Sequence, residues 1–106
     1  MTPEGQIKAK IDRVLDSYFP LVYKFKPVPS GYGHQSVDYL VCAVGLFVGI
    51  EAKAPGKTPT SRQDDTLDKI RRAGGAILVI SDDAGVARLD ELLKNQTNGN
   101  RYEDHE

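Results

Sequence analysis

Hydrophobic positions recur with a helical period at both ends of this chain and with a strand period in its middle. Residues 2–17 place apolar residues on one helical face, at Ile7, Ile11, Val14 and Leu15. This spacing predicts an amphipathic helix. Thr2 is suited to cap that helix and Pro3 to its first position.

The middle of the chain reads as strands separated by loops. Residues 21–26 alternate between apolar and polar side chains, and residues 37–53 form two apolar runs around a short Gly-containing turn. That arrangement predicts one strand followed by a β-hairpin. Residues 27–36 and 54–60 are rich in Pro and Gly, so both are expected to be loops.

The C-terminal half predicts a helix, a strand and a second helix. Ser61 or Thr60 caps a helix that runs to about Ala73, and residues 76–80 form a short, wholly apolar strand. The last helix has four inward-facing residues, Val86, Leu89, Leu92 and Leu93. Residues 96–106 are polar without an apolar stripe, so we expect a disordered tail there.

This order of elements, α-β-β-β-α-β-α, predicts an α/β fold. The strand, helix and strand at the end imply a parallel crossover, which joins the antiparallel hairpin in one sheet. The central β-sheet is therefore expected to be mixed and flanked by helices. A chain of 106 residues is one domain's worth.

Composition narrows the class of protein. No stretch approaches the roughly 20 apolar residues of a membrane helix, and the N-terminus lacks a signal-peptide pattern, so we expect a cytosolic protein. Cys42 is the single cysteine, which excludes an internal disulfide, and its apolar strand predicts a buried core residue. The net charge of −1 argues against binding DNA through overall charge but leaves a local basic patch open.

Three charged residues stand out in the hairpin. If its loop consists of the two residues Val44 and Gly45, then Asp38 lies directly opposite Glu51, with Cβ atoms roughly 4.5–5.5 Å apart. Two such carboxylates repel unless they share a proton or a cation. Lys53 points to the same face as Glu51. The pattern predicts a small site for a divalent metal with a cation beside it.

Other interpretations of the hairpin remain open. A one-residue slip would put the carboxylates on opposite faces and remove the site. A cross-strand ion pair on a solvated sheet is the plain alternative. The apolar flanks disfavour it, because they suggest interior strands covered on both sides, where charges are costly.

Five stretches of the chain carry a family resemblance: T-P-E-G, Asp38, G-L-F-V-G-I-E-A-K, P-G-K-T-P-T-S-R-Q and A-G-G-A-I-L-V-I. Together they resemble the VRR-NUC family of the PD-(D/E)xK nuclease superfamily, in its small stand-alone viral and bacterial form. The resemblance covers about residues 2–95 and implies a restriction-endonuclease-like core, with one nuclease domain over residues 1–95. Val37 departs from the pattern, since the family often has Pro there.

The resemblance also implies roles at the site. Asp38, Glu51 and the Ala52 carbonyl would bind Mg²⁺ or Mn²⁺, and Lys53 would act as a base or as a fixed cation. Gln63 would orient groups at the site, although a first-turn glutamine can also simply face solvent. Glu4 would be an acidic helper from the first helix, where acids are favourable in any case.

Two further surfaces are expected. One is a row of basic residues that would contact DNA phosphates, called the phosphate track here, and the other is a dimer surface. Candidates for the track are Lys24, Lys26, Lys57 and Arg62, with scattered solubilising charges as the alternative. Strand 76–80 and the leucines of the last helix are the candidate dimer surface, with the monomer's own core as the alternative. For two loop residues, His34 and Tyr32, a surface position is expected.

These features predict a Mg²⁺- or Mn²⁺-dependent endonuclease acting on DNA, leaving 5′-phosphate and 3′-hydroxyl ends as the superfamily resemblance implies. Stand-alone members resemble Holliday-junction resolvases in dimerising, and a homodimer suits the two symmetric cuts of a four-way junction. A flap or nick nuclease, a non-catalytic DNA-binding or adaptor module, and a domain of a larger machine are the alternatives. The expected location is the cytoplasm of a bacterial cell or phage-infected host.

Overall fold

The computed structural model describes residues 1–28 and 37–98, and its elements follow the predicted order. They are α1 (Pro3–Ser17), β1 (Val22–Phe25), β2 (Tyr39–Ala43), β3 (Leu46–Ala52), α2 (Ser61–Arg72), β4 (Ala76–Ile80) and α3 (Asp83–Gln96). The strands form one sheet in the order β1-β2-β3-β4, antiparallel except for the parallel pair β3 and β4. The predicted mixed α/β fold is therefore confirmed. His34 and Tyr32 lie outside the described residues.

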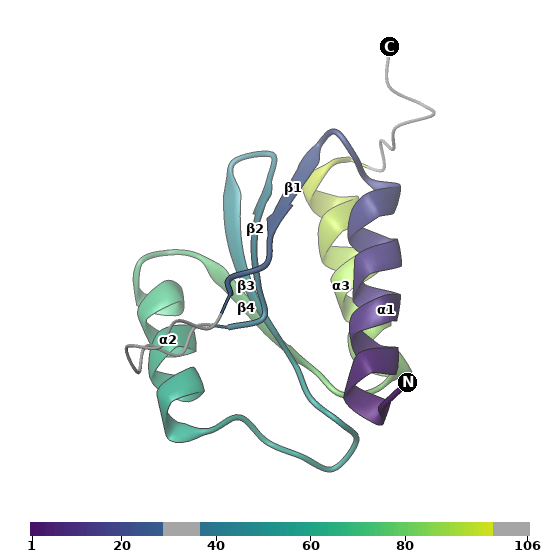
Figure 1. Ribbon diagram of the computed structural model, residues 1–106. Coiled ribbons are helices and arrows are strands. Elements are labelled where there is room, and N and C mark those ends of the chain that lie inside the picture. Colours follow the sequence, from purple (N-terminus) through teal and green to yellow (C-terminus); the bar gives the residue numbers. More distant parts are fainter. Residues whose placement is uncertain (29–36, 99–106) are drawn as a thin grey trace.

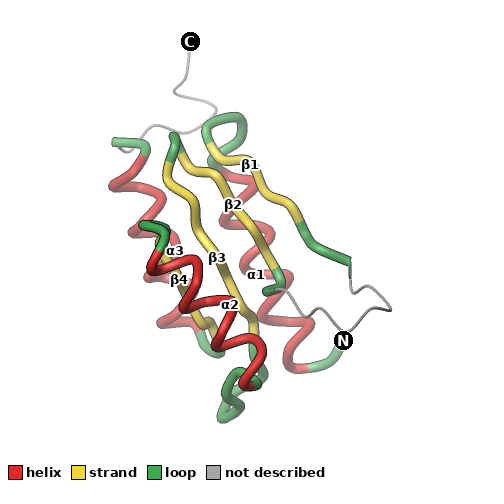
Figure 2. Tube along the Cα trace, turned by 90° about the vertical axis from the view of Figure 1, so that its left-hand side faces the viewer, coloured by secondary structure: helices red, strands yellow, loops and turns green. Residues whose placement is uncertain are grey.

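The helices lie on the two faces of the sheet. Helices α1 and α3 lie side by side against one face, and α2 lies on the opposite face (Figure 1). Figure 2 shows the strands in sheet order, with α2 passing over β3 and β4. Gly49 allows α2 to approach, because a Cβ on that residue would lie 2.6 Å from the Cδ1 atom of Ile70.

The core lies between the sheet and the pair α1 and α3. Its fully buried residues come from α1, α3 and the sheet, and they include Ile11, Leu15, Tyr39, Val41, Val48, Ile50, Leu89 and Leu93. Leu89 and Leu93 thus stabilise the monomer, and Leu92 packs against the same core. Strand β4 is half-buried to buried. For the buried leucines the alternative interpretation, the monomer's own core, is the one that holds, because they bury their apolar surface within one chain.

The hairpin turn has the predicted length. Val44 and Gly45 are its two loop residues, with φ angles of 48° and 86°. Positive φ at both positions is typical of a type I′ turn, whose twist matches that of the strands. It is unfavourable for a β-branched residue. Gln96 donates a hydrogen bond to the Val44 carbonyl over 3.2 Å, so the end of α3 holds this turn in place.

The same contact moves the predicted boundary of the C-terminal tail. Gln96 is the last residue of α3, and Thr97 is buried with its hydroxyl donating to the Leu93 carbonyl over 2.8 Å. Residues 96–98 therefore belong to the folded domain rather than to a tail. Residues 99–106 lie outside the described part of the chain.

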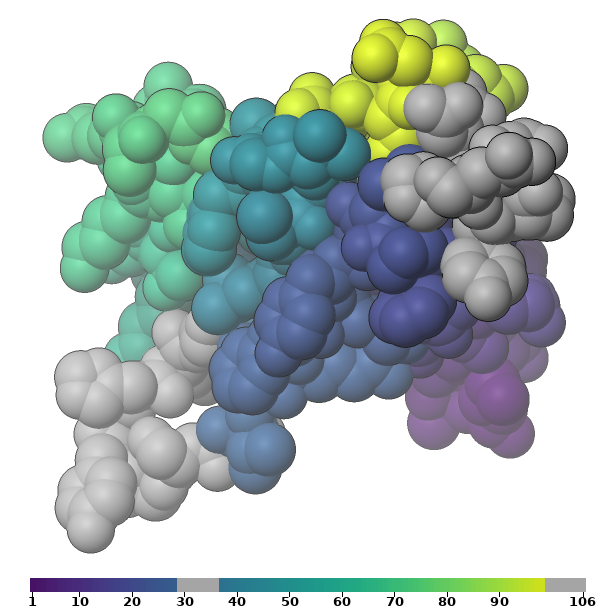
Figure 3. All heavy atoms as spheres, turned by 90° about the horizontal axis from the view of Figure 1, so that it is seen from above, coloured from purple at the N-terminus to yellow at the C-terminus, as the bar shows by residue number. Residues whose placement is uncertain are grey.

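One part of the sheet is not covered by a helix. Tyr23, Cys42 and Phe47 are neighbours across β1, β2 and β3, and all three are exposed. Phe25 lies on the same face and is also exposed. In the view of Figure 3, β1 in blue and the β2–β3 turn in teal lie at the surface beside α2 in green. The predictions that Cys42 is buried and that both hairpin faces are covered were wrong here, because α2 packs mainly against β3 and β4 and leaves Cys42 and Phe47 exposed.

Candidate functional site

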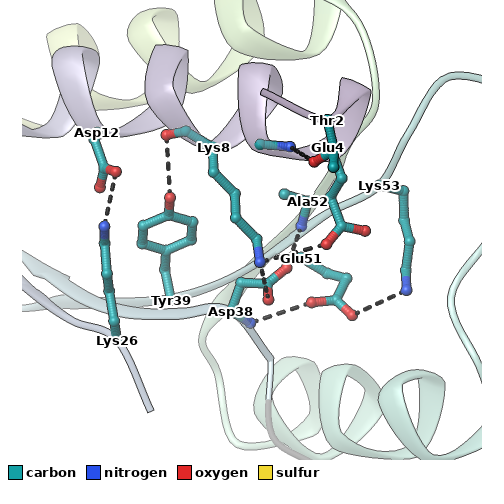
Figure 4. A network of polar contacts seen from close by, with 11 residues as sticks. Thr2, Glu4, Lys8, Asp12, Lys26, Asp38, Tyr39, Glu51, Ala52 and Lys53 are labelled. Carbon is teal, nitrogen blue, oxygen red and sulfur yellow. Dashed lines mark hydrogen bonds and ion pairs between the residues drawn. The ribbon is translucent and has the colours of Figure 1, made fainter. Parts of the chain in front are cut away.

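Asp38 and Glu51 meet at the end of the hairpin. The last paired residues of β2 and β3 at that end are Tyr39 and Ile50, so Asp38 and Glu51 are next in register. The Asp38 N–H donates to Glu51 Oε1 over 3.2 Å, and the Ala52 N–H donates to Asp38 Oδ2 over 2.8 Å. Each carboxylate therefore accepts a backbone hydrogen bond from the opposite segment of the hairpin (Figure 4).

Glu51 is fully buried, and one of its oxygens is not satisfied. Its Oε2 atom accepts no hydrogen bond from the described residues, and its nearest ion-pair partner is Lys53 Nζ at 3.6 Å. Burying a charged oxygen without a hydrogen bond is costly, and such groups often indicate an ion or water. This oxygen is the clearest structural signal of a binding site in the described chain.

The ionisation of Glu51 follows from this environment. Burial, reinforced by the neighbouring Asp38 carboxyl, raises the pKa of Glu51 to about 8, although Lys53 acts in the opposite direction. Near neutral pH the carboxylate pair therefore holds a proton when no cation is bound. A divalent ion would satisfy the same electrostatic requirement.

Lys8 also lies at the site, although it is not among the residues predicted for it. Its Nζ lies 3.4 Å from Asp38 Oδ1 and 3.4 Å from Glu4 Oε2. Burial lowers the pKa of Lys8, but the charges of Asp38 and Glu4 outweigh burial and raise it overall. Tyr39 fixes the backbone of α1 here by donating from its hydroxyl to the Lys8 carbonyl over 3.1 Å. A glutamate followed by a lysine four residues later is the sequence signal that could have identified this pair.

The two helix-derived residues predicted for the site are less directly involved. Glu4 lies in the first turn of α1 and is ion-paired with Lys8, which joins it to Asp38. The Gln63 side chain accepts the Thr60 N–H over 2.9 Å while Thr60 Oγ1 accepts the Gln63 N–H over 3.3 Å. This capping box gives Gln63 a role in starting α2. A catalytic role for Glu4 or Gln63 stays a prediction.

Two lysines of the predicted phosphate track, in β1 and directly after it, are paired with acidic residues of α1. Lys24 Nζ lies 3.0 Å from Asp12 and 2.9 Å from Asp16, and Lys26 Nζ lies 2.7 Å from Asp12. Acidic residues of α1 therefore compete with phosphate for both lysines, and a DNA contact by Lys24 or Lys26 stays a prediction. Lys57 and Arg62 are exposed and lie after β3, in the loop and in the first turn of α2.

The donor set suits a hard divalent cation. Asp38 and Glu51 supply carboxylate oxygens, and the Ala52 peptide lies against them through its N–H. Within residues 1–28 and 37–98, no group of three His, Cys, Asp or Glu side chains is arranged to hold a metal. Mg²⁺ commonly uses one or two carboxylates and keeps several waters. The unsatisfied oxygen of Glu51 fits such an ion, and Asp38 and Glu51 would hold it.

Comparisons with known proteins add no relative. No model of a protein family matches the chain, and no curated protein matches it either. Among the described residues, no helix has the length and apolar character needed to cross a membrane.

Proposed function

We propose that this chain is a metal-dependent endonuclease that hydrolyses DNA phosphodiester bonds, with Mg²⁺ or Mn²⁺ as its cofactor. The observation that carries the proposal is the buried, unsatisfied Glu51 oxygen beside Asp38 and Lys53. A restriction-endonuclease-like core is part of the same proposal. It is supported by the order of elements and by the place of both carboxylates at the end of the central hairpin.

The residues of the site have separable tasks in such a reaction. Asp38 and Glu51 hold the ion, which when bound lowers the pKa of a water molecule and offsets charge on the phosphate. Lys53 is ion-paired with Glu51, and this contact favours a fixed cation over a base. Its ammonium group would stabilise charge developing on the phosphate oxygens. The water oxygen attacks phosphorus and the bond to the 3′ oxygen breaks, leaving a 5′-phosphate and a 3′-hydroxyl.

The preferred substrate in this proposal is a four-way DNA junction cut by a homodimer. Two symmetric cuts need two sites related by a two-fold axis. The uncovered sheet face of Tyr23, Phe25, Cys42 and Phe47 is the surface we assign to the second copy. It replaces the surface expected from the sequence, because exposed apolar patches are typical of interaction sites whereas α3 is committed to the core.

Shape also favours a protein partner on this face. A hollow of about 420 Å³ lies beside the exposed aromatic residues and is lined by Phe47, Lys69, Ile70, Ala73 and Gly75. An aromatic side chain from a second copy could enter such a hollow, which would bury the apolar surface that α2 leaves open.

The experiment that tests the function compares labelled linear, flap, splayed and four-way DNA in Mg²⁺, Mn²⁺ or EDTA. The wild-type chain is expected to cut in either metal and not in EDTA, with the four-way junction cut fastest. Glu51→Gln is expected to abolish cutting, whereas Glu91→Gln, the same change at an exposed position of α3, should leave it unchanged.

Other results would redirect the proposal. Preferential cutting of flaps would identify a flap nuclease, and binding without cutting would support a DNA-binding module. Equal cutting by wild type and Glu51→Gln would show that another residue or a contaminant performs the reaction.

A further inference from the structure

Lys8 contacts the same carboxylate, Asp38, that a bound metal ion would need. Asp38 uses its Oδ2 atom to accept the Ala52 N–H, so Oδ1 is the oxygen that faces Lys8 Nζ at 3.4 Å. The same ammonium group lies 3.4 Å from Glu4 Oε2. Lys8 thus places one positive charge between Glu4 of α1 and Asp38, a predicted metal ligand directly before β2 (Figure 4).

We propose that Lys8 is the resident counter-cation of this acidic site and limits its affinity for divalent metal. The inference rests on the proposed function. When Asp38 and Glu51 hold a metal ion, the Lys8 ammonium would face a doubly charged neighbour within a few ångströms, and two cations that close repel. Metal binding therefore requires Lys8 to move away from Asp38, and that displacement lowers the affinity.

The surroundings of Lys8 allow this movement without unfolding the helix. The lysine side chain is 39% exposed, and its flexible stem lets the charged end move. The backbone stays in place because the Tyr39 hydroxyl holds the Lys8 carbonyl over 3.1 Å. Glu4, one turn earlier on α1, remains as a partner for the displaced ammonium. Lys8 is thus a positioning residue, whose ammonium group leaves Asp38 when metal binds and keeps its contact with Glu4.

A matched control lies on the same helix. Lys10 is also 39% exposed and forms an ion pair, with Nζ 2.6 Å from Asp83 Oδ1 at the start of α3. Lys10→Met removes an equally exposed, equally paired lysine, and its charge does not contact the carboxylates of the site. Any effect shared by both variants therefore reports general loss of an ion pair on α1.

Calorimetric titration of the full chain with Mn²⁺, after removal of metal with EDTA, tests the inference. Lys8→Met is expected to bind Mn²⁺ about tenfold more tightly than wild type, the order expected for losing one nearby, solvent-screened charge. Lys10→Met and the charge-conserving Lys8→Arg should stay close to wild type. Circular dichroism checks folding, and Lys8→Gln repeats the measurement if Lys8→Met does not fold.

The failures of the two proposals differ. If wild type binds Mn²⁺ and Lys8→Met or Lys8→Gln binds it no more tightly, Lys8 is only a structural ion pair and this inference is overturned. If wild type itself shows no Mn²⁺ binding, the proposed function fails, and the inference fails with it.

Discussion

The backbone N–H of Asp38 donates to the Glu51 side chain from directly across the hairpin, over 3.2 Å. The last backbone pair at this end of the hairpin is Tyr39 and Ile50. The Asp38 bond extends the pairing by one residue, with the Glu51 carboxylate as acceptor in place of a backbone carbonyl. It keeps Glu51 Oε1 against the chain and leaves Oε2 buried without a hydrogen bond. The relationship explains why a residue this costly to bury is held in one orientation.

The metal-free protein should become less stable as the pH rises. The folded pKa of Glu51 is raised from 4.5 to about 8, so between these values the folded state binds more protons than the unfolded state. The free energy of unfolding therefore falls as pH increases across that window. Thermal melts in EDTA from pH 4.5 to 8.5 should show a declining melting temperature.

Glu51→Gln should flatten that decline and keep or raise the melting temperature at pH 8, because the amide cannot ionise. Glu91→Gln should retain the wild-type slope. A marked drop in the metal-free melting temperature of Glu51→Gln would show that the Glu51 carboxylate is stabilising instead.

Asp38 should separate metal binding from hairpin stability. Asp38→Asn keeps an oxygen that can accept the Ala52 N–H but removes the charge, so we expect loss of Mn²⁺ binding with little loss of stability. Asp38→Ala also removes the acceptor and should be less stable than Asp38→Asn by about 1 kcal/mol. Calorimetric titration and thermal unfolding measure the two effects. Unchanged Mn²⁺ affinity in both variants would contradict the assignment of Asp38 as a ligand.

Gln63 can be tested as a cap and as a catalytic residue independently. Gln63→Glu preserves the capping box with Thr60 and should keep wild-type stability, whereas Gln63→Ala should lose about 1 kcal/mol. If Gln63 also orients groups at the site, Gln63→Glu should slow DNA cleavage without a change in melting temperature. Wild-type cleavage by Gln63→Glu would limit this residue to its role in α2.

DNA affinity should depend steeply on salt through basic residues outside β1. Each phosphate contact contributes about 0.9 to the slope of log affinity against log salt, so paired Ala substitutions at Lys57 and Arg62 should reduce the slope by about 2. The pair Lys24 and Lys26 is the control, because both lysines are already bound to acids of α1. Binding to a labelled junction in Ca²⁺ or EDTA measures the slopes. A larger change of this slope for the Lys24 and Lys26 pair would show that these two lysines contact the phosphates.

Dimerisation should depend on the uncovered face of β1 and β2. Tyr23→Lys or Phe25→Lys places a charge on that face and is expected to convert a homodimer to a monomer in light scattering at micromolar concentration. Val28→Lys changes an exposed apolar residue outside the sheet and should leave the dimer intact. A wild-type monomer at this concentration would remove the dimeric resolvase proposal while leaving the nuclease proposal open.

The sequence by itself determined the order of the elements and the meeting of Asp38 with Glu51. Both follow from local rules: periodicity selects helix or strand, and a two-residue turn fixes the hairpin register at Val44 and Gly45. Lys53 follows from the same strand alternation, so the centre of the candidate site could be predicted without a structure.

Only the tertiary structure decided which groups surround that centre. Lys8 reaches Asp38 from thirty positions earlier in the chain, and Asp12 pairs with both Lys24 and Lys26. The exposure of Cys42 depends on how far α2 extends across the sheet. These contacts depend on where each helix docks, and docking is set by the packing of whole faces, as where Ile70 meets Gly49. Local periodicity predicts which face of a helix is apolar, but it carries no information about what the polar residues at its border will meet.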